Sequence, residues 1–212
     1  MGTILDLHIH SRFSLDSNVE PEKYVEHLVN LRKSFRIDGL AFCEHRAFNS
    51  GLDPDPLGKK YGVLVFVGVE VESRWGHLLV FSPDRAWLKS LDFFRKPDAI
   101  ELFSQAESHE GIAIPAHPFR GIISLGDRVR QIPNLHAIET INGANLPEEN
   151  LKARMVAQEL GIAELGGSDA HCLEEVGKGL TEFQVQVSSL AEMIQEVKAR
   201  RVRAISRDEA RI

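Results

Sequence analysis

Short apolar runs alternate along this chain with segments in which apolar residues recur at helical spacing. The apolar runs, rich in β-branched residues, predict strands at 3–9, 38–43, 63–69, 112–116, 136–140, 162–166 and 202–205. The segments of helical spacing predict helices at 21–34, 98–108, 147–160 and 188–200. Strands that alternate with helices are typical of β/α units and a largely parallel sheet. Seven such strands are enough to close a barrel, which we favour, although the pattern alone leaves an open doubly wound sheet as the alternative.

One stretch departs from this alternation. In GVEVESRWGHLLVFS, residues 68–82, two apolar runs flank the turn-like SRWG. This pattern predicts a hairpin-like excursion from the strand that ends at Glu70. The hairpin would bring Glu70 and His77 close together.

Composition and charge narrow the class of protein. A chain of 212 residues fits a single domain over residues 1–212, and its 43% hydrophobic and 26% charged content is ordinary for a globular protein. Two cysteines, no leader pattern and no window with the ~18 apolar residues of a membrane span predict a cytoplasmic protein without a membrane partner. The net charge of -6 argues against a stable nucleic-acid partner. It is compatible with a phosphorylated substrate, because bound cations reverse the local sign. The sequence does not indicate an oligomeric state.

Polar residues of metal-ligand type follow the predicted strands. The carboxyl ends of parallel strands share one face in β/α folds, so residues far apart in sequence converge there. His8 and His10 project to the same side of one strand, and Asp169 and His171 repeat that spacing near the end of the chain. The full set is His8, His10, Glu44, His45, Glu70, His117, Glu139, Asp169 and His171.

Taken singly, most of these motifs have an ordinary structural explanation. A His-x-His pair in a strand is more often hydrogen-bonded than metal-bound, His117 could be a loop histidine before a proline, and Asp169 could cap a turn. Glu70 is harder to explain, because a carboxylate that ends so apolar a strand is desolvated unless it is paired or metal-bound. Their joint occurrence at the same strand ends favours one shared metal site.

The motifs also resemble those of a known family. DLHIHS, AFCEH, GVEVES with GHLLVF, AHPFR, ETINGAN, and GGSDAH with GKGLTEF follow one another over residues 6–183. In this order they resemble the PHP family, the polymerase and histidinol phosphatase superfamily. The resemblance implies an α/β fold, a distorted seven-stranded (β/α)7 TIM-like barrel, with two or three divalent metal ions at the carboxyl ends of its strands. The chain lacks the long modules of polymerase members, so we expect a stand-alone enzyme.

The resemblance also implies nine metal ligands. They are His8, His10, Glu70 and Asp169 for a first ion, Glu70, His77 and His117 for a second, and Asp16, His45 and His171 for a third. Two positions differ from many members: Glu44 replaces an aspartate that orients the next histidine, and Asp16 replaces a histidine, which makes the third site richer in oxygen. Nitrogen and oxygen ligands without thiolate suit Mn, Fe or Zn.

These ligands predict hydrolysis. Two ions bridged by Glu70 and a hydroxide would generate a nucleophile at neutral pH, so we expect metal-dependent cleavage of a phosphoester in a small phosphorylated metabolite or nucleotide by a metal-bound hydroxide. Arg120 is the best candidate to hold the substrate phosphate, followed by Arg12 and Arg46; the alternative is that they are solvated loop arginines. His171 is one candidate to protonate the leaving group, beside a ligand-free histidine or a bound water.

Two other functions remain open at this point. An amidohydrolase-type enzyme that cleaves C–N bonds also begins with a strand-borne His-x-His, but that class commonly bridges its metals with a carboxylated lysine, where this chain has Glu70. A metal-stabilised, non-catalytic binding module is the second alternative. Degenerate relatives of that kind lose ligands, whereas all nine ligand types are present here.

Overall fold

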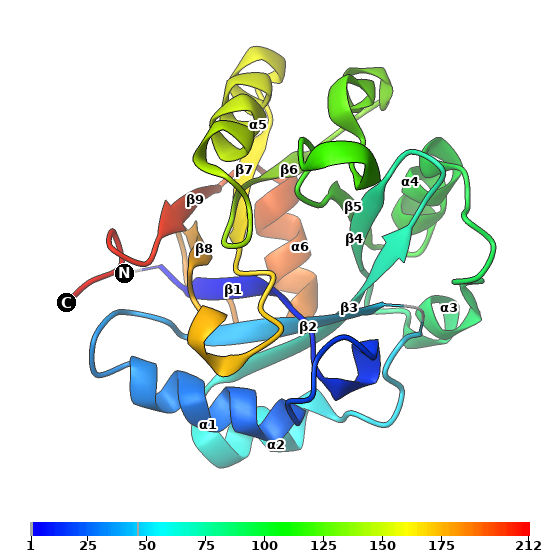
Figure 1. Ribbon diagram of the computed structural model, residues 1–212. Helices are drawn as coiled ribbons and strands as arrows, with labels where there is room; N and C mark the ends of the chain where they lie inside the picture. Colours follow the sequence, from blue (N-terminus) through cyan, green and yellow to red (C-terminus); the bar gives the residue numbers. More distant parts are fainter. Residues whose placement is uncertain (1, 46) are drawn as a thin grey trace.

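The computed structural model describes residues 2–45 and 47–212, and its strands form two sheets (Figure 1). The larger sheet has the order β5-β4-β3-β2-β1-β8-β9, and the smaller is the pair β6-β7. The strands are β1 Ile4–Ile9, β2 Gly39–His45, β3 Leu64–Glu72, β4 His77–Phe81, β5 Ile112–Pro115, β6 Ala137–Asn142, β7 Ala163–Gly167, β8 Gly179–Phe183 and β9 Val202–Ser206.

The larger sheet is open, which corrects the expected (β/α)7 barrel. Only β1, β2 and β3 pair in parallel, whereas β4 and β5 on one side and β8 and β9 on the other are antiparallel to their neighbours. The parallel pair β6-β7 lies between the two edges of this sheet, with β6 beside β5 and β7 beside β8 and β9. The result is one mixed α/β domain whose sheet curls without closing.

All seven predicted strands form, and two further strands explain the departure from the barrel. β4 is the second arm of the predicted hairpin and returns directly beside β3 after residues 73–76. β8 was not predicted, because its sequence GLTEF is short and contains glycine, threonine and glutamate among its five residues. Both strands run antiparallel to a neighbour, an arrangement that an alternation of β and α does not produce.

The four predicted helices form; α5 has the predicted bounds, and the other three are slightly shorter than predicted. Asp98 caps α4 by accepting hydrogen bonds from the backbone N–H groups of residues 100 and 101, and Ser189 caps α6. The short helices α2 and α3 were not predicted. The helices are α1 Pro21–Leu31, α2 Pro54–Tyr61, α3 Arg85–Ser90, α4 Ala99–Ser108, α5 Pro147–Leu160 and α6 Leu190–Lys198.

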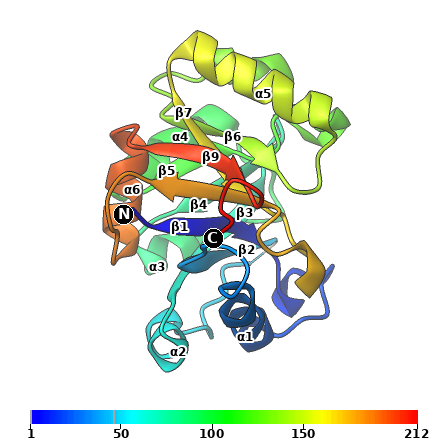
Figure 2. The ribbon, with the colours of Figure 1, turned by 90° about the vertical axis from the view of Figure 1, so that its left-hand side faces the viewer.

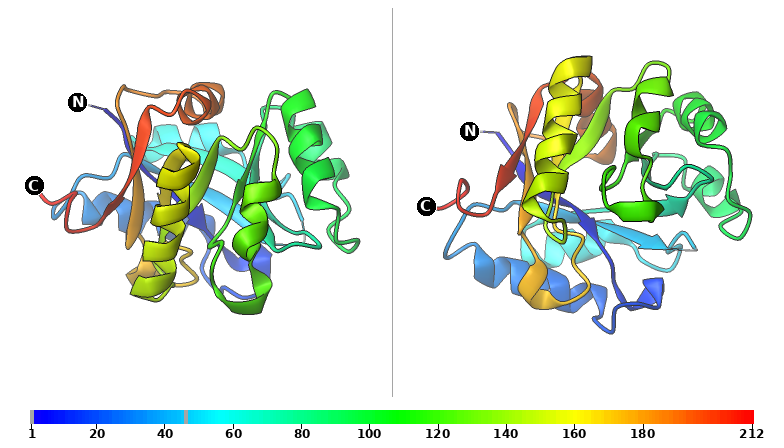
Figure 3. Two further views of the ribbon diagram at one scale, coloured as in Figure 1. Left: turned by 90° about the horizontal axis from the view of Figure 1, so that it is seen from above. Right: turned by 45° about the horizontal axis from the view of Figure 1, so that its top comes forward.

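The helices cover the outer surface of the curled sheet. Figure 2 shows β1, β8 and β9 one above another, with α1 and α2 below them and α5 above. Seen from above, α5 lies against β6 and β7, while α4 lies on the side of β5 (Figure 3). None of the helices in the described chain is both long enough and apolar enough to cross a bilayer.

Alternation along β1 places the polar side chains of this strand together. Leu5 and Leu7 enter one apolar cluster, whereas Asp6 and His8 point to the opposite face and are fully buried. His10 follows the end of the strand and is also buried. The fold therefore directs three titratable side chains into the interior of the curled sheet.

Candidate metal centre

The structure brings all nine predicted ligands together at the edge where β1, β2 and β3 end. His45 and Glu70 lie at the ends of neighbouring parallel strands and are register partners, and His77 begins the antiparallel β4 at the same edge. His8 lies within β1, and loops after β1, β5 and β7 contribute the others. Metal binding by these side chains stays a prediction. The distances between their ligand atoms show whether several of them could contact one cation.

Glu70 lies at the centre of the cluster and is almost completely buried. Its Oε2 lies 3.2 Å from Nε2 of His8, 3.2 Å from Nε2 of His10 and 3.3 Å from Nε2 of His45, and its Oε1 lies 2.8 Å from Nδ1 of His77 and 3.0 Å from Nε2 of His117. Burial alone would raise the pKa of Glu70. The nearby charges of His8 and His45 outweigh burial and hold that pKa well below its usual range.

Four side chains form what we call the buried group: His8, His10, Glu70 and Asp169. One ligand atom from each lies within 4.8 Å of all the others. Oδ1 of Asp169 is 3.3 Å from Nε2 of His8 and 3.1 Å from Nε2 of His10. Although His10 Nε2 has two carboxylate oxygens this close, it makes no hydrogen bond to any described residue. Among these contacts, His8 Nε2 and Glu70 Oε2 at 3.2 Å have hydrogen-bond geometry. A buried imidazole nitrogen without a hydrogen bond beside two carboxylate oxygens fits a shared cation.

Glu139 fixes the orientation of His8. Its Oε1 accepts a hydrogen bond from Nδ1 of His8 at 2.9 Å, so a neutral His8 ring has its lone pair on Nε2, which faces the buried group. Its Oε2 accepts from the backbone N–H of His117 at 2.6 Å and from the side chain of Asn142 at 2.9 Å. A carboxylate that accepts a hydrogen bond from the ring nitrogen opposite the ligand nitrogen of a histidine is typical of metal sites. Sequence reasoning included Glu139 among the strand-end residues but gave it no role.

Ser14 and Glu44 fix the orientation of His10. Ser14 Oγ donates to Oε2 of Glu44 at 2.7 Å, so it accepts from Nδ1 of His10 at 3.1 Å and leaves the lone pair of that ring on Nε2. Ser14 Oγ also accepts from the backbone N–H of His45 at 2.9 Å. The resemblance implied that Glu44 orients His45, but its contacts support His10 instead. Ser14 was missed, because a serine in a short 3-10 turn, Arg12–Ser14, carries no signal of its own.

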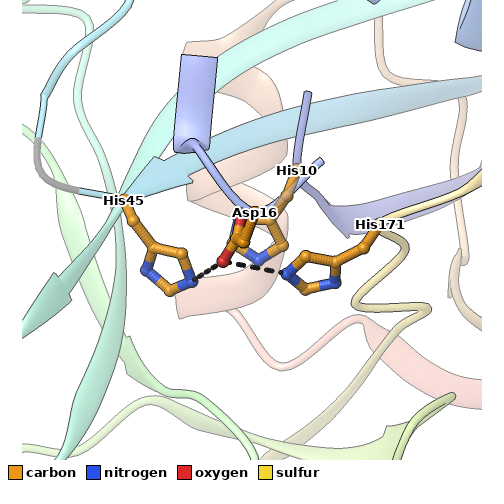
Figure 4. A group of neighbouring side chains, drawn as sticks. All are labelled: His10, Asp16, His45 and His171. Atoms are coloured by element: carbon orange, nitrogen blue, oxygen red, sulfur yellow. Dashed lines mark ion pairs between the residues drawn. The ribbon is translucent and has the colours of Figure 1, made fainter. Parts of the chain in front are cut away.

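The remaining ligands form two groups nearer the surface. The middle group is His45, Glu70 and His77, and the outer group, shown in Figure 4, is His10, Asp16, His45 and His171. Oδ2 of Asp16 lies 3.5 Å from Nε2 of His45 and 3.3 Å from Nε2 of His171. Burial lowers the pKa of His45 to about 4, against the opposing charge of Glu70. The outer group matches the implied third site with the addition of His10.

His117 stands slightly apart from its implied partners. Its Nε2 approaches Glu70 at 3.0 Å and its ring centroid lies 5.2 Å from that of His77. The middle group that comes within 4.8 Å contains His45 in place of His117. His117 and Asp169 also have positive φ angles, +31° and +57°, a conformation that non-glycine residues adopt mainly where the surroundings enforce it.

Asp6 holds the loop that carries Asp169. Its carboxylate accepts backbone hydrogen bonds from Ser168 at 2.9 Å and from Gly177 at 2.8 Å, and the backbone N–H of Asp169 donates to the carbonyl of His8 at 2.7 Å. Burial raises the pKa of Asp6 to about 6, although these hydrogen bonds oppose the shift. Asp6 is therefore a support for the loop and lies outside the ligand groups.

The three candidate arginines differ in their surroundings. The guanidinium of Arg120 donates to Oδ2 of Asp169 at 2.7 Å, to the side chain of Asn145 at 2.7 Å and to the side chain of Asn142. Arg12 is exposed and pairs with Glu20. Arg46 lies outside the described residues. The contacts of Arg120 favour a structural role behind Asp169, while its predicted role toward substrate stays a prediction.

Replacing Arg120 should weaken metal binding. In Arg120→Ala, Asp169 loses the partner that fixes its carboxylate, and loss of such an outer contact typically costs about 10- to 100-fold in metal affinity. The metal affinity of Arg120→Lys should lie between those of the wild type and Arg120→Ala. The lysine ammonium can pair with Asp169 but cannot also donate to both asparagines, as the planar guanidinium does. Calorimetric titration of chelator-treated protein with Zn²⁺ measures the affinity, and Arg130→Ala, at an exposed ion pair with Glu159, is the control. Unchanged metal affinity combined with a raised KM would instead support a phosphate-binding role.

Sequence comparison finds two partial matches. Residues 147–202 match the model of the PHP-associated family, PHP_C. An uncharacterized protein of Methanocaldococcus jannaschii is 27% identical over 148 residues, which cover 65% of this chain and 80% of that protein.

Solved structures with the same fold cover nearly the whole chain. PsfC from Pseudomonas syringae superposes with a TM-score of 0.73 at 22% identity, over 99% of this chain and 94% of that one. A two-domain protein from Bacteroides vulgatus, containing a predicted PHP-like metal-dependent phosphoesterase, gives 0.67 at 19% identity, over 97% and 65%. Endonuclease Q, in complex with a duplex carrying an abasic lesion, gives 0.65 at 21% identity, over 94% and 57%. At these identities the likeness concerns the fold.

Proposed function

We propose that the chain is a member of the PHP superfamily and a metal-dependent hydrolase of phosphoester bonds. The observation that carries the proposal is the buried group, in which two histidine lone pairs and two carboxylates converge and His10 Nε2 has no hydrogen bond to a described residue. The proposed ligands are the nine named above, for two or three ions of Mn, Fe or Zn. Bound divalent ions supply a low-pKa water and offset the charge of the phosphoryl oxygens.

The chain's own residues position this chemistry. Glu139 and Ser14 hold the rings of His8 and His10 with their Nε2 atoms directed inward. His171 donates from Nδ1 to the carbonyl of Asp169 at 2.9 Å, which leaves its Nε2 toward Asp16 in the outer group. We propose that His171 moves a proton from Nε2 to the leaving group when two ions are bound and no third ion occupies the outer group, and that Arg12, Arg46 and Arg120 include the residues that contact the phosphate.

A small substrate fits this proposal better than a polymer. A cavity of about 470 Å³ opens at the middle and outer groups, which is the size of a typical small-molecule site. Endonuclease Q binds a DNA duplex, and this disagrees with the expectation that the present chain has no stable nucleic-acid partner. The net charge of -6 favours the small substrate, and a duplex with an abasic site belongs among the test substrates.

Hydrolysis of C–N bonds is the second candidate. Among the described residues, the side chain in the bridging position is Glu70, and every group within ion-pair distance of it is a histidine. A carboxylated lysine, common in amidohydrolases, has no counterpart among these contacts. The geometry therefore favours phosphoester hydrolysis. We also propose that the protein is cytoplasmic, because both of its cysteines are free.

Metal removal and resupply test the proposed function. Chelator-treated protein should lose hydrolysis of phosphomonoesters or phosphodiesters and regain it with Mn²⁺, Fe²⁺ or Zn²⁺, because the ligands alone offer no activated nucleophile. The measurement is initial rate over a panel of phosphoesters, amides and an abasic duplex, with metal content determined on the same samples. Activity on amides alone would favour the amidohydrolase reading, and loaded protein inactive on every substrate would favour a binding module.

A further inference from the structure

The cavity at the candidate metal centre has an apolar side. It is lined by Ser14, Leu15, Asp16, His45, Glu70, Glu72, His77, Phe93 and Phe94. Six of these nine residues are polar or titratable. The three apolar ones, Leu15, Phe93 and Phe94, come from the loops after β1 and before α4. The surface that would meet the part of a substrate outside the phosphate is therefore partly hydrophobic.

Two of these apolar side chains are unusually exposed. Phe94 is 89% exposed and Leu15 is 78% exposed. Leu15 also has a φ of +70°, a strained conformation for a residue with a branched side chain, and it lies between Ser14, which contacts His10, and the predicted ligand Asp16. Exposed apolar surface rimmed by polar residues is typical of binding sites.

Local contacts hold Phe94 in place. Oδ1 of Asp92 accepts from the backbone N–H groups of Phe94 at 3.0 Å and Arg95 at 3.1 Å, forming a turn. The neighbouring Phe93 is partly buried against the hydrophobic core. Phe94 is therefore presented at the cavity by an anchored turn.

The same loop is tied to the hairpin of β3 and β4. Lys96 forms an ion pair with Glu72 at 2.5 Å, and the backbone N–H of Arg74 donates to the carbonyl of Pro97 at 2.9 Å. These contacts connect the loop to the strand that supplies Glu70. The position of Phe94 relative to the candidate metal centre is thus set by the fold.

The charge of the lining limits what this apolar side can take. Among the described lining residues none is a lysine or an arginine, and Asp16, Glu70 and Glu72 are acidic. A second anionic group on the substrate, away from the metal ions, would find no lysine or arginine among the described lining residues. A flat uncharged ring would meet the face of Phe94, where stacking is favourable.

We propose that Phe94 and Leu15 bind an aromatic ring carried by the leaving alcohol of the phosphoester substrate. The inference rests on the proposed function, since it places the phosphoryl group at the candidate metal centre. The substrate class is a phosphate ester of a ring-bearing alcohol, such as a nucleoside, in preference to a simple sugar phosphate. Phe94 is then a specificity-determining residue.

A matched pair of ligands tests the role of the ring. Adenosine 5′-monophosphate and ribose 5-phosphate share the phosphate and the leaving 5′-oxygen, and their leaving alcohols differ in the adenine base. Stacking of a base on an aromatic side chain is worth about 1–3 kcal/mol, which is about 5- to 150-fold at 1.4 kcal/mol per tenfold. We expect metal-loaded protein to favour the nucleotide by at least about fivefold, both in kcat/KM and in affinity measured by calorimetry.

Variants at Phe94 should change this preference. Phe94→Ala should reduce the nucleotide preference to within about threefold of unity, while Phe94→Trp should retain it because a larger ring still stacks. Phe13→Ala is the matched control, because Phe13 is an exposed phenylalanine that does not line this cavity, and it should leave the preference unchanged.

The calorimetric measurement separates this inference from the proposed function. Loaded protein that hydrolyses neither ligand but binds the nucleotide preferentially, with loss of that preference in Phe94→Ala, would support the ring site and contradict hydrolysis of these esters. Equal binding of both ligands, binding of neither, or an equal loss for both in Phe94→Ala would overturn the ring site. Hydrolysis of both esters without preference would leave the proposed function standing alone.

Discussion

Asp169→Asn should abolish turnover while leaving the chain folded. The substitution keeps the shape of the side chain but removes the negative charge that faces Nε2 of His8 and His10 at 3.3 and 3.1 Å. A bound metal ion supplies several kcal/mol of transition-state stabilisation, and each 1.36 kcal/mol corresponds to tenfold in rate, so we expect kcat/KM to fall about 10³-fold or more. His10→Ala should have the same effect by removing the ring whose Nε2 has no hydrogen bond to the described residues. Initial rates with resupplied metal measure both losses.

Two controls show whether these losses come from the candidate metal centre. Asp127→Asn removes an exposed carboxylate that pairs with Arg130 and should leave kcat/KM unchanged. Circular dichroism should show native secondary structure for every variant, and added metal should raise the melting temperature of the wild type but hardly that of Asp169→Asn. Either variant turning over at the wild-type rate with a native spectrum would refute the buried group as the reaction centre.

The convergence of the ligands could be predicted although the sheet does not close into the barrel that we favoured. His45 is the last residue of β2 and lies beside Glu70 of β3 in register, so their approach requires only the local parallel pairing of β2 and β3. His77 belongs to the antiparallel β4, and it reaches the same edge because a hairpin returns the chain where β3 ends. Whether the sheet closes is decided elsewhere, by β8 and the separate pair β6-β7.

The supporting contacts could not be predicted, because they depend on loop conformations and on partners far apart in sequence. Arg120 follows the ligand motif AHPFR and was expected to face a phosphate, but its guanidinium contacts Asp169, 49 residues away. Ser14 reaches Glu44 across 30 residues, and Glu139 reaches His8 across 131. Residue type and strand ends indicate which side chains can coordinate metal, whereas the tautomer of each histidine follows from these longer-range hydrogen bonds.

Glu70→Gln should impair both the buried and the middle group, since Glu70 belongs to each. An amide offers one acceptor oxygen and no charge where the carboxylate meets five imidazoles, so we expect kcat/KM to fall about 10³-fold or more and metal-induced stabilisation to disappear. In chelated protein, the pKa of Glu70 lies well below its usual range, so its charge stabilises the fold above the unfolded pKa, and that contribution is lost as the pH falls through the folded pKa. Removing one partner of a buried ion pair costs about 3–5 kcal/mol, which urea unfolding of chelated protein at pH 7 would measure.

Glu182→Gln is the matched control for this prediction. Glu182 also lies in a strand, β8, but pairs with the exposed Arg203 at 2.6 Å, so its replacement should change the free energy of unfolding by less than about 1 kcal/mol. The chelated protein isolates the charge of Glu70 from the metal, because its ion-pair partners among the described residues are then the histidines around it. If chelated Glu70→Gln were as stable as the wild type at pH 7, the carboxylate would not be compensating protonated histidines. A loss of stability that is larger at pH 7 than at pH 4 would follow from the sign of the pKa shift.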